Sequence, residues 1–300
     1  MLELNKCNFV HFSFLSKNEK KEIENQIKTL DQVSQLIFGC LALGAVGDTL
    51  GFGSGHRDPK FLNKKIIPWE LCGKSELIQQ IIQQNYGHYR NIHFRSPKGE
   101  QAWVVSDDTI LHFMQAEVIA LNYKNDMKVD QIIQEIAKKH ALTLEYQINQ
   151  KKNERCFGCS TRRTWRQFTN DPINWKNAIT FNSEATGCAG SMRGMVFGLL
   201  FPGSKNEDKL IESVVNAAFL TNPSLISVLG TLASASFASF SLSNIPINEW
   251  LPELKNNFLK TYEYLDNLKN QENLPQNYRN LIINCLDEVT WSHIIDCWQF

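Results

Sequence analysis

Helical periodicity is the feature that most limits what this chain can fold into. Apolar residues recur every three or four positions in four segments, 107–123, 130–146, 209–220 and 226–242. Few stretches show the alternation of polar and apolar residues that a half-buried strand requires. The sequence therefore predicts an all-α protein, folded as a compact bundle of many helices.

Two segments are rich in small residues. Gly44, Gly47 and Gly51 fall on roughly one helical face of the segment that begins at Gly39, and residues 228–242 are mostly Ala, Ser and Gly with a few larger side chains. Missing side chains let helices approach closely, so both segments are predicted to be interior helices, in which leucine at position 47 would overpack the core. The hydroxyl groups of the second segment argue against a membrane span.

The 300 residues divide into three parts. Residues 1–32 are predicted to be an N-terminal extension with an amphipathic helix, in which Ser16 and Glu19 have capping-box spacing. Residues 33–265 form the predicted domain, with irregular structure between 58 and 99. Residues 266–300 are interpreted as a polar linker around Pro275 and a short tail.

Charge and cysteine content limit the location and the partners. Lys plus Arg equals Asp plus Glu, at 31 each, so no overall field favours nucleic acid or a membrane. The first residues lack the pattern of a secretory signal or a mitochondrial presequence, which predicts an intracellular, cytoplasmic protein, cytoskeletal assemblies included. The eight cysteines are expected to be free thiols. Cys156 and Cys159 form a CxxC, and no second pair completes a zinc set.

Adjacent acidic residues follow a serine in the stretch VVSDDTILHF. Ser106, Asp107 and Asp108 stand directly before an apolar helical run. A serine cap and two carboxylates at the positive end of a helix dipole explain this pattern structurally. The same oxygen atoms are also suitable ligands for Mg²⁺. The stretch alone does not decide between these interpretations.

A glycine-rich turn precedes a second apolar helix in TGCAGSMRGMVFGLLF. Gly187, Gly190 and Gly194 flank Ser191 and Arg193. Backbone amides at such a helix start can hold a diphosphate or a sugar. Glycines in this position also allow close helix packing, so this pattern alone does not decide between ligand binding and packing.

Taken together, the motifs resemble those of a known family. In order, GAVGDTLGF, WVVSDDTILHFMQAEVIA, FNSEATGCAGSMRGMVFGLLFPG and LTNPSLISVLGTLASASFASFSLSNIPINEW are similar to the ADP-ribosylglycohydrolase family, and most similar to its ADP-ribosylarginine hydrolase branch. The resemblance extends from about Gly39 to Trp250. It implies an all-helical bundle in which two Mg²⁺ ions position ADP-ribose while water attacks the anomeric carbon and releases arginine.

The resemblance also implies site residues. Ser106, Asp107 and Asp108 match the family's first group of metal ligands, and Gly187, Cys188, Gly190 and Ser191 match its ribose and phosphate turn. It assigns no catalytic residue with certainty. One weakly bound Mg²⁺ ion, or none, is expected.

Three departures from the family pattern are expected to weaken catalysis. A late Asp-Ser-Asp-Ser/Thr segment, which supplies the remaining metal ligands in the family, has no counterpart before Phe300. The stretch TNPSLISV, from Thr221, replaces a histidine run on the substrate side. The turn reads TGCAGSMR where the family tends to GGCGAAMR, which adds bulk at Thr186 and Ala189.

The resulting prediction is a catalytically impaired family member with a structural or interaction role in a larger assembly. The alternatives are an active Mg²⁺-dependent ADP-ribosylarginine hydrolase and a protein that binds ADP-ribose without cutting. Protein partners are expected, with ADP-ribose or ADP-ribosylated protein as ligands and neither nucleic acid nor membrane. Core helices missing at the end of the chain are expected to leave an apolar surface that a partner covers.

Overall fold

The chain forms two compact units, Met1–Ser106 and Asp107–Phe300. The computed structural model describes residues 17–52, 94–95, 101–102, 105–124, 127–149, 157–287 and 291–292. The predicted cap at Ser16 and most of the irregular segment 58–99 lie outside these residues. The all-α prediction is confirmed: apart from one pair of two-residue strands, the regular structure in these ranges is helical.

The first unit contains the predicted N-terminal helix, α1 (Lys17–Thr29), followed by α2 (Gln32–Phe52). Between them, Asp31 accepts hydrogen bonds from the backbone N–H and the hydroxyl of Ser34, at 3.0 and 2.7 Å, which stabilises the start of α2. Strands β1 (Phe94–Arg95) and β2 (Gln101–Ala102) pair antiparallel, with Phe94 opposite Ala102.

Within the described part of the chain, α2 has exposed as well as partly buried side chains, and its predicted interior position stays a prediction. Leu36 and Leu43 are 52% and 72% exposed. A Cβ atom added at Gly39 or Gly47 meets no described atom within 4 Å. A face of small residues permits close packing, but it does not supply the second helix.

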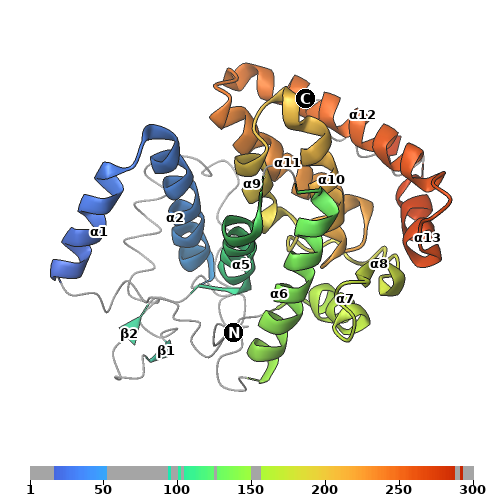
Figure 1. Ribbon diagram of the computed structural model, residues 1–300, viewed down its shortest axis with the longest axis horizontal. Helices are drawn as coiled ribbons and strands as arrows, with labels where there is room; N and C mark the ends of the chain where they lie inside the picture. The colour runs from blue at the N-terminus through green and yellow to red at the C-terminus, as the bar shows by residue number, and fades with distance from the viewer. Residues whose placement is uncertain are drawn as a thin grey trace, which may run out of the picture. The chain divides into compact units, whose positions relative to one another are not determined.

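The second unit is a bundle in which α9 and α11 lie side by side near the centre (Figure 1). The predicted interior position of 228–242 is confirmed, because Val228, Leu232 and Ala235 are fully buried. The helices are α5 (Asp107–Asn122), α6 (Val129–Asn149), α7 (Cys159–Phe168), α8 (Trp175–Ala178), α9 (Ser191–Leu200), α10 (Glu207–Phe219), α11 (Leu225–Leu242), α12 (Trp250–Lys269) and α13 (Gln276–Cys285), with short 3-10 turns at Ser204–Asn206 and Ile247–Glu249.

Glycines bring α9 and α11 into close contact. A Cβ atom at Gly194 would lie 2.5 Å from the carbonyl oxygen of Thr231, and one at Gly198 would lie 1.9 Å from that of Ala235. Both distances are shorter than van der Waals contact, so only glycine fits without a backbone shift. The spacing of Gly190, Gly194 and Gly198 follows one helical face.

The interpretation of 266–300 as linker and tail is wrong for residues 276–285, which form α13. Tyr278, Leu281, Ile282 and Cys285 are fully buried. Pro275 stands directly before the helix, at its N-cap. Proline is tolerated at a helix start, because its fixed φ suits the helix and its missing N–H breaks no hydrogen bond within it. Farther along, the indole of Trp291 donates to the carbonyl of Cys285 at 2.6 Å.

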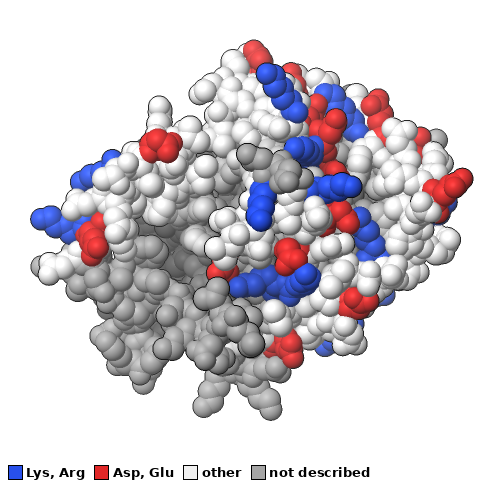
Figure 2. All heavy atoms as spheres, in the orientation of Figure 1, with Lys and Arg blue, Asp and Glu red and all other residues white. Residues whose placement is uncertain are grey.

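Among the described helices, α11 alone has the length and the hydropathy to cross a membrane, and 67% of that segment is buried inside the protein. Its position between α9, α10 and α12 is that of a core helix. The face seen in Figure 2 carries Lys and Arg interspersed with Asp and Glu. The ion pairs of the described residues include Lys139–Glu117, at 3.1 Å.

Candidate functional site

The acidic pair lies in the first turn of α5, as the sequence predicts. Asp107 is the first residue of the helix and is 7% exposed, and Asp108 is partly buried. Carboxylates there are stabilised by the positive end of the helix dipole. The predicted position of the pair at the start of a helix is therefore confirmed, and the role of both residues as metal ligands stays a prediction.

Ser106, directly before α5, is held by a residue from the first motif. Its backbone N–H donates to Asp48 Oδ2 at 2.8 Å and its hydroxyl donates to Asp48 Oδ1 at 2.6 Å. Because the hydroxyl proton goes to Asp48, which lies on α2, the lone pairs of Ser106 Oγ are oriented away from that carboxylate. Asp48 belongs to the GAVGDTLGF motif, and its role in the structure is to accept both hydrogen bonds from Ser106.

The glycine-rich turn has an exposed and a buried half. Gly187 and Cys188 are exposed, whereas Gly190 is buried and Ser191, the first residue of α9, is partly buried. A Cβ atom at Gly190 would lie 2.2 Å from Thr231 Oγ1 and 2.7 Å from Ser227 Oγ, so packing on α11 alone requires this glycine. The binding role of all four residues stays a prediction, and Gly187 and Cys188 are the two that solvent reaches freely.

A buried arginine anchors this turn. Arg193 is fully buried, and its guanidinium donates to the carbonyl of Ala189 at 2.7 Å, to Gln115 Oε1 at 3.1 Å, and to the carbonyl of Ala217 and Thr221 Oγ1 at 2.6 and 2.5 Å. Gln115 in turn donates to the Arg193 carbonyl at 3.0 Å. One side chain thus joins α5, the glycine-rich turn and the end of α10.

No carboxylate is among the hydrogen-bond partners of Arg193 in the described chain. Burial lowers the pKa of Arg193 to about 9, which leaves the guanidinium protonated at neutral pH. Burial, and to a lesser degree the Arg193 charge, lowers the pKa of His112 to about 4 and that of His140 well below its ordinary value. Both histidines are therefore neutral near pH 7, and Arg193 is a positive charge within the core.

The TNPSLISV stretch, which departs from the family pattern, forms the end of the turn between α10 and α11 and the first residues of α11. Thr221 accepts from Arg193, and Ser224 caps α11 by accepting from the N–H of Ser227 at 3.3 Å. Ser224 also donates to the carbonyl of Ala185 at 2.8 Å, which ties this turn to the segment before Gly187. Asn222 is buried next to Gly187, since a Cβ atom there would lie 3.5 Å from Asn222 Nδ2.

The structure brings two predicted groups onto one pair of packed helices. Gln115 and Arg193 join α5 to α9; Gln115 lies about two helical turns after Asp107, and Arg193 two residues after Ser191. Arg193 was named from the sequence without a role, and Gln115 was not predicted. The available signal was a single arginine in the otherwise apolar helix SMRGMVFGLL, because a charge on an interior helix must have polar partners.

The donor set suits a hard cation. Ser106, Asp107 and Asp108 provide only oxygen ligands, which Mg²⁺ prefers. The described ranges hold no cluster of three or more His, Cys, Asp or Glu side chains. The chemical type of these ligands is compatible with Mg²⁺, and a bound ion at this position stays a prediction. Cys156 lies outside the described residues, and Cys159 is an exposed free thiol.

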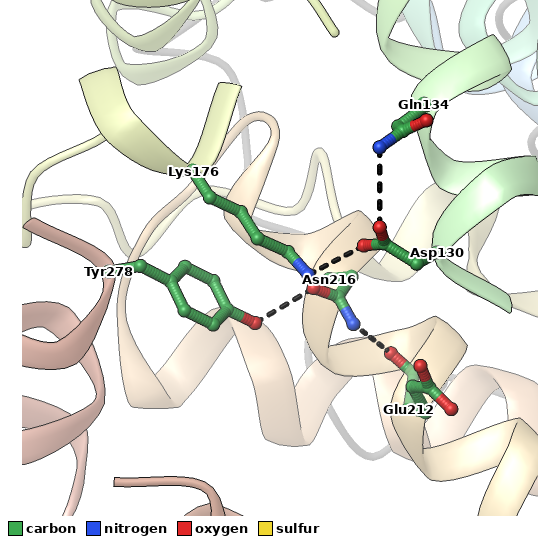
Figure 3. A network of polar contacts seen from close by, with 6 residues as sticks. All are labelled: Asp130, Gln134, Lys176, Glu212, Asn216 and Tyr278. Atoms are coloured by element: carbon green, nitrogen blue, oxygen red, sulfur yellow. Dashed lines mark hydrogen bonds and ion pairs between the residues drawn. The ribbon is translucent and has the colours of Figure 1, made fainter. Parts of the chain in front are cut away.

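A second polar cluster lies between α6, α8, α10 and α13 (Figure 3). Lys176 pairs with Asp130 at 2.6 Å and lies 5.1 Å from the ring centroid of Tyr278, whose hydroxyl donates to Asn216 Oδ1 at 2.8 Å. Burial raises the pKa of Glu212. The ion pair joins α8 to α6 and the Tyr278 hydrogen bond joins α13 to α10, so these contacts have a structural role.

Comparison with known proteins identifies the family of this chain. The ADP-ribosylglycohydrolase family model matches residues 29–292, most of the chain. The chain therefore belongs to the ADP-ribosylglycohydrolase family.

Two relatives illustrate the match. ADP-ribosylhydrolase ARH1 of Dictyostelium discoideum is 27% identical over 263 residues, which cover 86% of this chain and 59% of the relative. Protein L444 of Acanthamoeba polyphaga mimivirus, named as an ADP-ribosyl glycohydrolase, is 26% identical over 226 residues, which cover 72% of this chain and 39% of the relative. The chain thus spans between two fifths and three fifths of the length of these relatives.

Proposed function

We propose that this protein recognises ADP-ribose attached to other proteins and cleaves the bond between ADP-ribose and arginine weakly or not at all. The packing of α5 on α9 carries this proposal. The hydrogen bonds between Gln115 and Arg193, at 3.0 and 3.1 Å, join the helix that begins with the acidic pair to the helix that begins with the glycine-rich turn. A metal-assisted diphosphate site needs both groups on one rigid support.

The charge of the acidic pair supports weak catalysis. Asp107 and Asp108 are the adjacent carboxylates at the start of α5. Two Mg²⁺ ions would bring twice as much positive charge as this pair offsets, whereas one ion matches it and can share its shell with water and diphosphate oxygens. A bound Mg²⁺ ion would polarise the oxygens of ADP-ribose and orient the ligand.

An active hydrolase is the second candidate. The Ser106-Asp107-Asp108 motif is present, and a relative with 27% identity is named an ADP-ribosylhydrolase. Under this hypothesis the remaining metal ligands come from another part of the protein or from a second chain, and turnover requires Asp107.

The test combines binding and turnover. Calorimetry would measure ADP-ribose binding to the wild type and to Asp107→Ala, with and without Mg²⁺, beside an assay for ADP-ribose release from modified arginine. We expect Mg²⁺-dependent binding and little turnover. Robust turnover that Asp107→Ala abolishes would establish the hydrolase instead. The absence of both binding and turnover would leave a purely structural role.

We further propose that the partners are ADP-ribosylated proteins inside the cell, within a larger assembly. The mixed charge of the visible surface supports neither a nucleic-acid partner nor an anionic membrane as the main target (Figure 2). Affinity capture with an ADP-ribosylated and an unmodified form of the same protein would test this. Equal capture of the two forms would contradict the proposal.

A further inference from the structure

The buried Arg193 costs the fold more than an apolar side chain would. It is fully buried on the apolar helix α9, and its described hydrogen-bond partners are two carbonyls, one amide and one hydroxyl. A buried charge without an opposite charge is destabilising, and a well-packed hydrophobic residue of similar volume is often neutral or better. Packing alone therefore does not explain an arginine at this position.

The hydrogen bonds of Arg193 fix three segments that carry sequence motifs. Its Nε holds the carbonyl of Ala189, at the centre of the glycine-rich turn, and Nη2 holds Ala217 and Thr221, at the start of the turn into α11. Nη1 holds Gln115 on α5. A planar guanidinium with donors in a fixed fork suits this task, because it orients all three segments relative to one another.

The bond to Ala189 has an electrostatic consequence for the start of α9. A carbonyl oxygen that pointed outward there would repel an anionic ligand. The oxygen of Ala189 is instead turned inward, 2.7 Å from Arg193 Nε. The helix dipole and the charge of the buried guanidinium both favour an anion at this end of the helix.

Two buried polar atoms packed against the glycine-rich turn provide a second observation. Asn222 Oδ1 and Ser227 Oγ are buried and have no hydrogen-bond partner in the described part of the chain. Asn222 lies against Gly187, and Ser227 lies against Gly190, where an added Cβ would be 2.7 Å from its hydroxyl oxygen. Buried polar groups in native proteins normally have partners, so the turn is a place where a polar ligand or ordered water is expected.

We infer that Arg193 is a positioning residue, whose guanidinium holds the turn at residues 187–191 in the conformation that receives the diphosphate of ADP-ribose at the start of α9. This inference rests on the proposed recognition of ADP-ribose. Arg193 does not contact the ligand. It acts through Ala189 on the turn and through Gln115 on the helix that carries the acidic pair.

The test uses the full chain and four proteins: the wild type, Arg193→Lys, Gln115→Met and Tyr278→Phe. Lysine keeps the charge but cannot reproduce the fork, and Gln115→Met removes one partner of the guanidinium. Tyr278→Phe is the matched control, because it removes a buried hydrogen bond of 2.8 Å, to Asn216, in the separate cluster of Figure 3. Circular dichroism and thermal melting would report folding, and calorimetry with Mg²⁺ present would report ADP-ribose affinity.

We expect Arg193→Lys to bind ADP-ribose at least about tenfold more weakly than the wild type, since displacements of about 1 Å in a positioned site have effects of this size or larger. Gln115→Met should show a smaller loss in the same direction, and Tyr278→Phe should bind like the wild type. Folded Arg193→Lys with wild-type affinity would overturn the inference, as would an equal loss in Tyr278→Phe. If Arg193→Lys does not fold, the ADP-ribose affinity of Gln115→Met provides the test, and wild-type affinity in that variant would overturn the inference.

Hydrogen exchange separates this inference from the proposed function. Amides of residues 187–192 should exchange faster in Arg193→Lys and in Gln115→Met, while those of α12 and α13 stay unchanged. A wild type that does not bind ADP-ribose would refute the proposed function and the ligand part of the inference, and exchange would still measure whether Arg193 holds the turn. Unchanged exchange in this turn would refute the positioning role whatever the ligand.

Discussion

Two carboxylates in the first unit hold a serine in the same way, and only one of the serines belongs to the predicted metal site. Asp48 accepts from the N–H and the hydroxyl of Ser106. Asp31 accepts from the N–H and the hydroxyl of Ser34, at the start of α2. Groups that orient a metal ligand affect metal affinity, whereas a helix cap affects only stability. The two aspartates therefore form a matched pair for mutagenesis.

We predict that Asp48→Asn lowers Mg²⁺ affinity by about 10- to 100-fold, the usual effect of removing a group that orients a metal ligand. The amide nitrogen of asparagine cannot accept from Ser106, so the serine loses one of its two bonds. Calorimetric titration with Mg²⁺ in the presence of ADP-ribose would measure the change. Asp31→Asn, the control, should leave the affinity unaltered, and equal affinities in the two variants would remove Asp48 from the site.

Ser224 is a residue whose role is structural although it lies in a stretch that departs from the family pattern. Its hydroxyl oxygen accepts from the N–H of Ser227 at the start of α11 and donates to the carbonyl of Ala185. Loss of such a cap costs about 0.5–2 kcal/mol. Ser224→Ala should therefore lower the free energy of unfolding by about that amount in urea titrations. An unchanged midpoint would show that the cap contributes nothing.

At the scale of helices, glycines in similar small-residue sequences differ in how closely other atoms pack against them. Gly198 on α9 faces α11, where a Cβ atom would lie 1.9 Å from the carbonyl oxygen of Ala235. Gly47 on α2 has no described atom within 4 Å of the same position. The effect of adding one methyl group should therefore differ in sign between the two helices.

We predict that Gly198→Ala destabilises the protein by about 1–3 kcal/mol or more, because the helices must separate to admit the Cβ atom. Gly47→Ala should instead be neutral, or stabilising by about 0.5–1 kcal/mol, because alanine restricts the unfolded chain and favours the helix. Thermal melting of the two variants beside the wild type measures both effects. An equal loss of stability in Gly47→Ala and Gly198→Ala would indicate that α2 is packed in the interior of the protein.

These helices also show what the sequence could predict. The helices α5, α6, α10 and α11 were predicted because their apolar periodicity reflects their burial directly. The interior position of α2 stays a prediction, because small residues indicate that close packing is allowed and say nothing of the partner. In α13 the helical spacing of Tyr278, Leu281, Ile282 and Cys285 was obscured by the polar residues between them and by Pro275, which begins the helix and does not interrupt it.

The candidate site was predictable only where its residues are neighbours in sequence. Ser106, Asp107 and Asp108 form a local motif, and so do Gly187 to Ser191. The role of Arg193 depends on Gln115, 78 positions away, and on Thr221, 28 positions away. Such bonds follow from how α5, α9 and α10 pack, and a local pattern does not contain that information.

At the scale of the whole molecule, the buried histidines make stability depend on pH. His112 is 4% exposed, and burial, followed by the charge of Arg193, lowers its pKa from 6.5 to about 4. His140 is fully buried, and its pKa is lowered for the same reasons. Below pH 6.5 the unfolded chain binds protons at these positions before the folded protein does. Their contribution to stability is therefore complete above pH 6.5 and is lost as the pH falls, for His112 toward its pKa of about 4 in the folded protein. Glu212 acts in the opposite direction, because burial raises its pKa and lets the folded state take up a proton first.

We predict that His112 alone lowers the free energy of unfolding by about 2 kcal/mol between pH 7 and pH 5, as linkage requires for a shift of this size. Urea unfolding at the two pH values would measure the difference for the wild type and for His112→Phe, in which an aromatic ring fills the site without titrating. The variant should lose a smaller amount of stability on acidification, whatever its stability at pH 7. An identical loss in both proteins would mean that the pKa of His112 is the same in the folded and the unfolded protein, and burial beside Arg193 would then not perturb it.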